Sequence, residues 1–285
     1  MTLRVGRVEE IWRYPIKSMG GEQLDSCRLE RRWGIPGDRG WAVRDEHAGE
    51  IRGAKKIPSL LRCRARYTEE PQGDAAPTVE IALSDGRAIR SDAPNVSQVL
   101  STELGREVTL WPRRPADDLA HYRRAVKLDE AEIRAQLGLL PDESLPRFGD
   151  ASPPELAEFT SPPGTYFDAF ELHLLTRASL ARLAQLLPDS HIDVRRFRPN
   201  LLIDTGAAGL PELDWCGQTL RIGALRLHVV QPTVRCVMTT CAQADLSKDP
   251  RIMRTLVRNL TQRLGVGASV IEPGEVRVGD PVELS

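Results

Sequence analysis

Short strand-like runs, separated at regular intervals by turns with glycine or proline, limit most strongly what this 285-residue chain can fold into. The runs are rich in Val, Ile, Leu, Trp and Tyr, side chains that suit a half-buried pleated surface. They fall at residues 3–16, 41–44, 79–83, 87–89, 108–111, 172–175, 200–204, 219–230 and 276–282. Many short strands with few helices are typical of barrels and sandwiches. The sequence therefore predicts a mainly β fold with some α (the α+β class), built as two β-barrel-like domains.

Four segments have helical periodicity instead. Two short patterns cover residues 96–104 and 128–139. Thr176 can cap a third helix, and Asp249-Pro250 is a start signal for a fourth. The apolar stripes of these two helices consist of Leu180, Leu183 and Leu187, and of Ile252, Leu256, Leu260 and Leu264. Such stripes indicate core-facing helices rather than a cofactor box.

A proline-rich stretch over residues 112–164 divides the chain. Its length and composition are typical of connecting loops that are functional or mobile. We expect an N-terminal domain over residues 1–115 and a C-terminal domain over residues 116–285. The connection between them could form part of a substrate rim.

Composition and charge exclude several classes of protein. The formal net charge of -1 argues against a nucleic-acid partner, because general nucleic-acid binders carry a strong basic excess. No segment approaches the roughly 20 apolar residues that span a bilayer. The N-terminal residues also lack the architecture of a signal peptide. We therefore expect a cytoplasmic protein without a membrane anchor.

Five cysteines are scattered through the chain, and none forms a Cys-x-x-Cys pair. Iron–sulfur clusters and structural zinc sites need several closely spaced ligands, so neither is predicted. A disulfide framework is equally unexpected in a large intracellular chain. At most one cysteine should carry chemistry, and the others should be small buried side chains.

Cys236 is the strongest candidate among these cysteines. It directly follows Arg235 and precedes Thr239-Thr240, so a thiolate at this position would be favoured electrostatically. A thiolate is both a nucleophile and a soft metal ligand. An Arg-Cys pair alone is also typical of a buried strand residue beside a solvated arginine.

Three further segments place basic or polar side chains at the ends of predicted strands. Lys17-Ser18 stands before two glycines, where an ammonium, a hydroxyl and backbone N–H groups can meet an oxyanion. Arg39 follows a Gly-Asp turn, and Arg198 and Asn200 flank a proline that fixes the chain between them. Arginine suits phosphate better than lysine does. The alternatives are an ordinary turn and solvated strand ends.

A Ser-His-Asp hydrolase is poorly supported. The chain has no Gly-x-Ser-x-Gly elbow. His173 and His228 lie inside predicted strands, which is most simply explained by partly buried structural histidines.

Together, these segments resemble the MOSC family, in the branch that carries an N-terminal β-barrel domain and includes the mitochondrial amidoxime-reducing component and its bacterial relatives. The resemblance rests on five motifs in the family's order, and it spans nearly the whole chain. The motifs are residues 14–18, 37–39, 196–200, 235–240 and 278–282. It implies an N-terminal MOSC-type β-barrel domain followed by a C-terminal MOSC β-barrel domain.

The resemblance also implies a molybdenum cofactor, in which molybdopterin carries the metal. Cys236 would be the catalytic protein ligand of molybdenum, and Asp168 matches an acidic residue near the metal. Lys17, Ser18 and Arg39 would grip the pterin phosphate. The remaining implied contacts to phosphate or pterin are Thr176, Arg198, Asn200 and Arg235. A multiply anionic cofactor would explain a basic pocket inside a nearly neutral protein.

The activity implied by the family is the reduction of small N-hydroxylated or N-oxygenated substrates by oxygen removal at the Cys-ligated molybdenum. Because the chain has no flavin or iron–sulfur motif, a separate redox protein should donate the electrons. Two alternatives remain: sulfur transfer through a Cys236 persulfide, and a carrier that binds the molybdenum cofactor for delivery. Val234 and residues 241–245 depart from the eukaryotic pattern, which leaves the identity of the substrate open.

Overall fold

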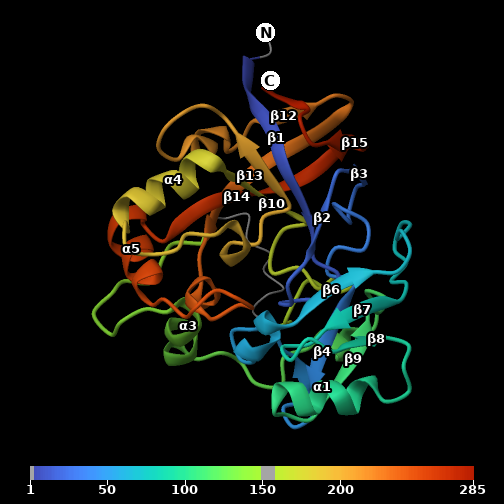
Figure 1. The fold of residues 1–285 in the computed structure, drawn as a ribbon. Coiled ribbons are helices and arrows are strands. Elements are labelled where there is room, and N and C mark those ends of the chain that lie inside the picture. Colours follow the sequence, from blue (N-terminus) through green and yellow to red (C-terminus); the bar gives the residue numbers. More distant parts are fainter. Residues whose placement is uncertain (1–2, 149–157) are drawn as a thin grey trace.

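A closed β-barrel is the larger of the two units in the computed structural model, which describes residues 3–148 and 158–285 (Figure 1). Seven strands close it through a pairing between β1 and β11, and the short strand β2 extends the sheet at β1. The strands are β1 (Leu3–Arg13), β2 (Glu22–Leu24), β10 (Leu172–Thr176), β11 (Leu201–Asp204), β12 (Thr219–Ile222), β13 (Leu225–Val234), β14 (Arg263–Glu272) and β16 (Pro281–Leu284). Closure leaves the barrel without unpaired edges.

The first strand closes the barrel by pairing antiparallel with β16 along its first half and with β11 further on. Gly6 sits where these contacts meet, and a Cβ there would lie 2.5 Å from the carbonyl oxygen of Asp204. β1 and β2 thus belong to a barrel formed mostly by the C-terminal half. The domain boundary near residue 115 stays a prediction. Local sequence does not reveal that β1 pairs with a strand some 200 residues further along the chain.

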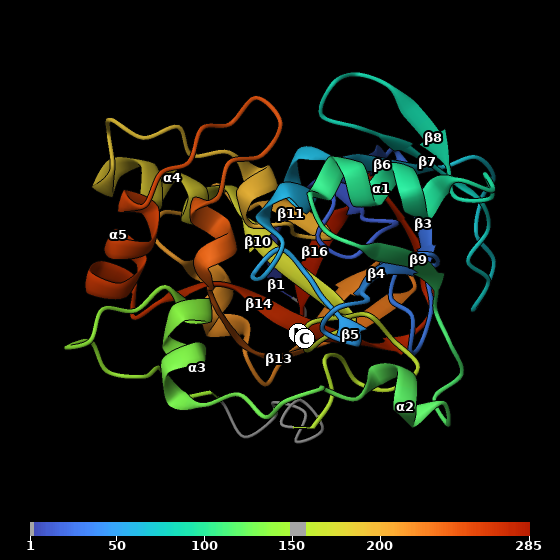
Figure 2. The same cartoon turned by 90° about the horizontal axis from the view of Figure 1, so that it is seen from below.

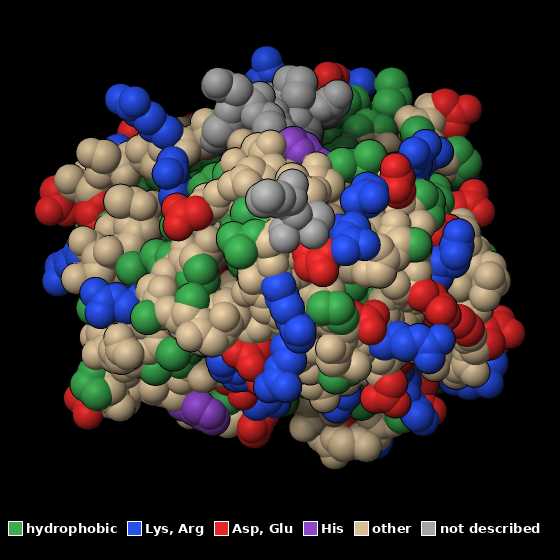
Figure 3. Space-filling model, turned by 90° about the horizontal axis from the view of Figure 1, so that it is seen from above, with side chains coloured by type: hydrophobic (Ala, Val, Ile, Leu, Met, Phe, Trp, Pro, Cys, Tyr) green, Lys and Arg blue, Asp and Glu red, His purple; other side chains and the backbone are tan. Residues whose placement is uncertain are grey.

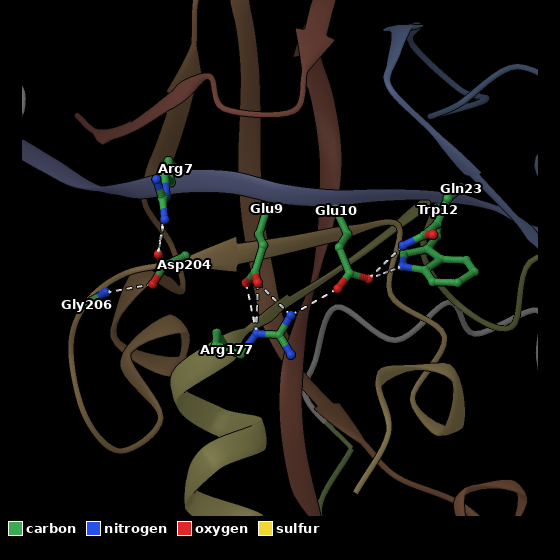
Figure 4. A network of polar contacts seen from close by, with 8 residues as sticks. All are labelled: Arg7, Glu9, Glu10, Trp12, Gln23, Arg177, Asp204 and Gly206. Carbon is green, nitrogen blue, oxygen red and sulfur yellow. Dashed lines mark hydrogen bonds and ion pairs between the residues drawn. The ribbon is translucent and has the colours of Figure 1, made fainter. Parts of the chain in front are cut away.

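A parallel pair, β10 and β11, is joined by a crossover that contains helix α4 (Arg177–Leu186) and the 3₁₀ turn η3 (Val194–Arg196). Arg177, at the start of α4, donates to the carboxylates of Glu9 and Glu10 on β1 (Figure 4). The register shift between Val8 and Glu10 is a bulge in β1. These ion pairs are partly exposed, so each contributes little to stability, but they hold α4 against the barrel.

Two helices cover one flank of the barrel and share a core with it (Figure 2). They are α4 and α5 (Arg251–Leu260). Leu180 and Leu183 are buried there as predicted, together with Ile252, Leu256 and Leu260. The predicted extension of the last helix to Leu264 is wrong, because the chain turns left-handed at Thr261 and Leu264 belongs to β14. Leu264 still packs in this core.

The second unit consists of two three-stranded sheets around a separate core. One sheet contains β4 (Trp41–Asp45), β5 (Glu50–Ile51) and β9 (Val108–Pro112), and the other β6 (Arg64–Tyr67), β7 (Val79–Ala82) and β8 (Ala88–Arg90). Helix α1 (Val96–Leu104) and the 3₁₀ turn η1 (Pro58–Arg62) complete it. A separate two-stranded sheet, in which β3 (Ser26–Leu29) pairs with β15 (Gly274–Arg277), packs on the core of the barrel. The predicted α+β class is confirmed, and so is the hairpin at Asp85-Gly86.

The connection between the units includes the short helix α2 (Leu119–Tyr122) and α3 (Glu130–Leu137). Tyr122 and Tyr166 are fully buried beside His121, and the Tyr166 hydroxyl lies 2.6 Å from Nε2 of that histidine. The connection is therefore anchored to the fold at His121 and Tyr122, whereas Val126 and Phe148 are exposed. Residues 149–157, which belong to the same predicted connection, lie outside the described residues.

The formal net charge of the chain is close to zero, at -1. On the face seen in Figure 3, basic and acidic side chains are interspersed. Among the described residues, no helix combines the length and apolarity needed to cross a bilayer.

Candidate active site

A cavity of about 120 Å³ lies where the barrel meets the second unit. It is lined by six of the nine residues predicted for the site: Arg39, Asp168, Arg198, Asn200, Arg235 and Cys236. A second cavity of about 280 Å³ is lined by Lys17 and Ser18 and shares Asp168 and Met238 with the first. The structure thus brings eight of the nine predicted residues to two adjoining cavities.

Cys236 follows the end of β13 and begins the 3₁₀ turn η5 (Val237–Thr240). Its free thiol is half-buried, and Met238 just beyond it is packed in the core of the second unit. Thr239 Oγ1 donates a 3.1 Å hydrogen bond to the Cys236 carbonyl. Cys236 is therefore held at the junction of the two units by a turn that is anchored on both sides.

Arg235 is held by its backbone and by one edge of its guanidinium group. Gln262 accepts from the Arg235 N–H at 2.8 Å and donates from Nε2 to the Arg235 carbonyl at 2.9 Å. Nη2 donates to the Phe197 carbonyl at 2.7 Å, and Nη1 lies 3.2 Å from His173 Nε2. Nε is buried and has no partner in the described parts of the chain.

His173 also lines the smaller cavity. Its position inside a predicted strand had indicated only a structural histidine. Burial, with a further effect of Arg235, holds the pKa of His173 well below its ordinary value, so the ring is neutral. Because arginine can only donate, Nε2 of His173 acts as the acceptor. Gly265 leaves room for this ring, since a Cβ there would lie 2.3 Å from Nε2.

We expect the buried His173 to make stability depend on pH. Below about pH 6.5 the unfolded chain binds a proton that the folded histidine resists. The free energy of unfolding should therefore fall with decreasing pH, by up to about 1.4 kcal/mol per pH unit for one such group. His121, whose pKa burial also lowers, adds to this slope.

Urea unfolding between pH 7.5 and 5 measures this dependence. His173→Gln, which keeps an acceptor for Arg235, should have a shallower slope than the unmodified protein, with the remainder coming from His121. Equal slopes for the two proteins would contradict the assignment of a neutral His173.

Arg198 and Arg39 lie over the ring of Tyr14, with guanidinium carbons 4.1 and 4.8 Å from its centroid. Arg198 Nη1 donates to the Met19 carbonyl, but Nη2 is buried and no described residue accepts from it. Burial, and then the neighbouring Arg39, lower the pKa of Arg198 to about 10. Arg39 is paired with the buried Asp38.

Asn200 holds these groups in place. Its Oδ1 accepts from the His173 N–H at 3.0 Å, and its Nδ2 donates to Asp38 Oδ2 at 3.0 Å. Its amide thus links β10 to the Arg39–Asp38 pair. A direct contact of Asn200 with a cofactor stays a prediction.

Three predicted site residues have a left-handed backbone. The φ angles are 68° at Ser18, 49° at Arg39 and 54° at Arg198, whereas side chains other than glycine rarely adopt positive values. Such conformations cost free energy and cluster at functional sites, where the surrounding structure enforces them. Arg32, Ala244, Thr261 and Gln262 also have positive φ angles, so three of the seven such positions among the described non-glycine residues are predicted site residues.

Lys17 and Asp168 form an ion pair between the two cavities. The buried Lys17 Nζ donates to Asp168 Oδ1 and to the Tyr166 carbonyl, each at 2.8 Å. Desolvation lowers the pKa of Lys17 against the opposing effect of Asp168. For Asp168, desolvation acts to raise the pKa, but Lys17 and Lys55 outweigh it and hold the pKa well below its usual range. Asp168 is therefore an ionised acceptor.

Thr176 is the exception among the predicted residues, because the structure brings it to neither cavity. It caps α4, as its sequence context predicts, by accepting from the Ser179 N–H at 3.1 Å. Its hydroxyl donates to the buried Glu212 at 2.6 Å. The predicted cofactor contact of Thr176 is therefore not supported: its hydroxyl serves the helix start and a buried carboxylate.

Arg196 has a structural role that the sequence alone did not indicate. Its guanidinium group donates to the carbonyls of Thr239, Cys241 and Ser247, at 3.4, 3.2 and 2.7 Å. It ties down the segment after Cys236. Arg196 belongs to the motif at residues 196–200, but nothing in this motif distinguishes it from Arg198. The two differ in the structure, because Nη2 of Arg198 has no acceptor among the described residues.

The fold and the site define a two-unit β protein whose joint cavity is lined by guanidinium groups and one thiol. Residues 163–283 match the MOSC domain, and residues 5–105 match the MOSC N-terminal beta barrel domain. The chain therefore belongs to the MOSC family and carries both domains. Membership of this family supports a function connected with the molybdenum cofactor.

Curated relatives align with nearly the whole chain. Mitochondrial amidoxime reducing component 2 of Rattus norvegicus is 27% identical, and that of Bos taurus 24%, each covering 98% of this chain and 83% of the relative. Mitochondrial amidoxime-reducing component 1 of Homo sapiens is 26% identical, covering 99% and 83%. Among solved structures, the YuaD protein of Bacillus subtilis matches with a TM-score of 0.47 and 14% identity, over 100% of this chain and 96% of its own.

Proposed function

We propose that the chain is a molybdenum-cofactor-dependent oxidoreductase that removes oxygen from N-hydroxylated or related N-oxygenated substrates. One observation carries the proposal: Arg198 Nη2 and Arg235 Nε are buried donors without a partner in the described structure, and both arginines line the same cavity as Cys236. A buried donor without an acceptor costs about 1–3 kcal/mol. An anionic ligand that accepts from both would remove this cost.

The residues present fit the pterin phosphate and the metal. Arg39, Arg198 and Arg235 offer guanidinium groups to an anion from three separate segments. Lys17 and Ser18 approach from the adjoining cavity. Cys236 offers a thiolate, which soft and thiophilic metals prefer. These residues would hold the cofactor, with Cys236 as the protein ligand of molybdenum.

When bound, the cofactor would supply the two-electron chemistry that takes oxygen from the substrate. The overall reaction consumes two electrons and two protons per N-hydroxyl group and yields the amine-type product and water. Asp168 would accept a hydrogen bond from the substrate's N–H or O–H, in an orientation fixed by Lys17. A separate redox protein would provide the electrons.

Turnover of benzamidoxime by protein made in a cofactor-competent host, with a chemical reductant, tests the proposal. We expect reduction to benzamidine in proportion to the molybdenum content. A Cys236 persulfide on metal-free protein, without amidoxime turnover, would indicate sulfur transfer instead. Bound cofactor that exchanges rapidly and never supports turnover would indicate a carrier.

A further inference from the structure

The larger cavity extends beyond the predicted cofactor contacts. It is lined by Lys17, Ser18 and Asp168 and by further residues from two segments, 50–56 and 124–136. Because Asp168 and Met238 line both cavities, a molecule in the larger one would lie beside the site of Cys236. The larger cavity is thus placed to receive the part of a substrate that does not react.

The charges of this cavity do not cancel. Its six basic lining residues are Lys17, Arg52, Lys55, Lys56, Arg124 and Lys127. Three acidic residues line it as well, and each is paired: Asp168 with Lys17, Glu50 with Arg52 and Glu132 with Lys56. Within the described part of the chain, Lys55 and Lys127 form no ion pair. The cavity therefore keeps a positive charge in a protein whose net charge is -1.

Lys55 is presented by a turn that is docked on the site. Ser18 Oγ accepts from the Ala54 N–H at 2.9 Å, and the N–H groups of Lys56 and Ile57 both donate to the Gly53 carbonyl at 3.0 Å. A Cβ at Gly53 would lie 2.7 Å from Ser18 Oγ, so the close approach needs glycine. Lys55 lines the same cavity as Lys17 and Asp168.

We propose that the enzyme prefers N-hydroxylated substrates that carry a carboxylate or phosphate group, with Lys55 and Lys127 as the residues that recognise this anionic group. The inference rests on the proposed reductase function and extends it to a substrate class. Lysine provides a point charge that suits either anion. The N-hydroxyl end of the substrate would lie beside Asp168, and its anionic end would lie beside Lys55 and Lys127.

Three probes test this preference on cofactor-loaded protein: benzamidoxime, 4-carboxybenzamidoxime and 4-phosphonobenzamidoxime. Steady-state reduction gives kcat/KM for each, and calorimetry gives the dissociation constant without turnover. We expect the better anionic probe to exceed benzamidoxime about tenfold in both quantities at low salt, as two partly screened charge contacts allow. Which anionic probe is better distinguishes a carboxylate from a phosphate substrate.

The variants Lys55→Gln and Lys127→Gln should each reduce the ratio of anionic to neutral kcat/KM about threefold, and leave benzamidoxime turnover unchanged. Arg4→Gln is the control, because it removes one charge from an exposed residue that lines neither cavity. Equal binding of all three probes would overturn the inference. So would variants that lower cofactor content at an unchanged ratio, because the lysines would then serve the cofactor phosphate. Turnover of benzamidoxime without anion preference refutes this inference alone; no turnover of any probe refutes the reductase function as well.

Discussion

Replacing Cys236 with serine is expected to abolish amidoxime reduction while much of the cofactor stays bound. A serine hydroxyl is neither a soft ligand nor ionised at neutral pH, so the metal would lose its protein sulfur. The loss should exceed the roughly 10- to 100-fold effect typical of groups that only support a metal ligand. The guanidinium groups that would hold the phosphate are unchanged in this variant, so binding of the cofactor should persist.

Turnover per bound molybdenum is the quantity to compare, with Cys241→Ser as the matched control. Cys241 is a buried thiol five positions further on, and its Sγ lies 3.5 Å from the Val237 carbonyl. It lines neither cavity, so its substitution should leave most of the turnover per molybdenum. Unchanged turnover in Cys236→Ser would refute the assignment.

The second large effect is a difference between two neighbouring arginines, Arg198 and Arg196, when each is replaced by methionine. Arg198→Met should weaken cofactor binding about 10- to 100-fold, because charge-assisted hydrogen bonds contribute about 1.5–3 kcal/mol. The cofactor-free protein should be destabilised less than by Arg196→Met, because only the Met19 carbonyl loses its donor and a buried cation with an unpaired Nη2 is removed as well. Arg196→Met should instead destabilise the fold by at least about 2 kcal/mol, because it leaves buried carbonyls unpaired.

Urea unfolding of the cofactor-free proteins and their molybdenum content after production at limiting molybdate measure the two effects separately. We expect the Arg198→Met protein to be stable without cofactor and to contain little molybdenum. Full loading of Arg198→Met, or equal destabilisation by both substitutions, would show that Arg198 belongs to the scaffold rather than to the anion site.

Local patterns predicted much of the fold because many of its helices and strands are determined by interactions among residues close together in the sequence. The helix at residues 96–104 and the hairpin at Asp85-Gly86 follow from short-range periodicity and turn chemistry. The ten-residue strand β14 was not predicted, because Gly265 and Gly267 interrupt its apolar pattern. Both glycines are needed for tertiary reasons: a Cβ at Gly267 would lie 2.2 Å from the Phe170 ring, and one at Gly265 would meet His173.

Most of the site could be predicted because its charged residues occur in motifs with an unusual concentration of basic side chains. Arg39, Arg198 and Arg235 come from three distant segments, and the structure places them around one cavity. Residues that act through contacts with these arginines carry no such signal. His173 resembles any histidine within a strand, and Gln262 becomes important only because the chain turns left-handed beside Arg235.

Thr176 is the predicted site residue that lines neither cavity. Its local signal, a hydroxyl before an apolar helical stripe, is that of a helix cap, and the structure uses it so. The cofactor contact came only from the resemblance and stays a prediction, while in the structure the hydroxyl donates to the buried Glu212.

X-ray absorption at the molybdenum edge, on protein purified from a cofactor-competent host, tests the central claim most directly. The account predicts about one molybdenum per chain and a sulfur ligand from Cys236 in addition to the pterin sulfurs. That contribution should disappear in Cys236→Ser while the metal remains. Protein without molybdenum, or an identical sulfur shell in Cys236→Ser, would contradict the account.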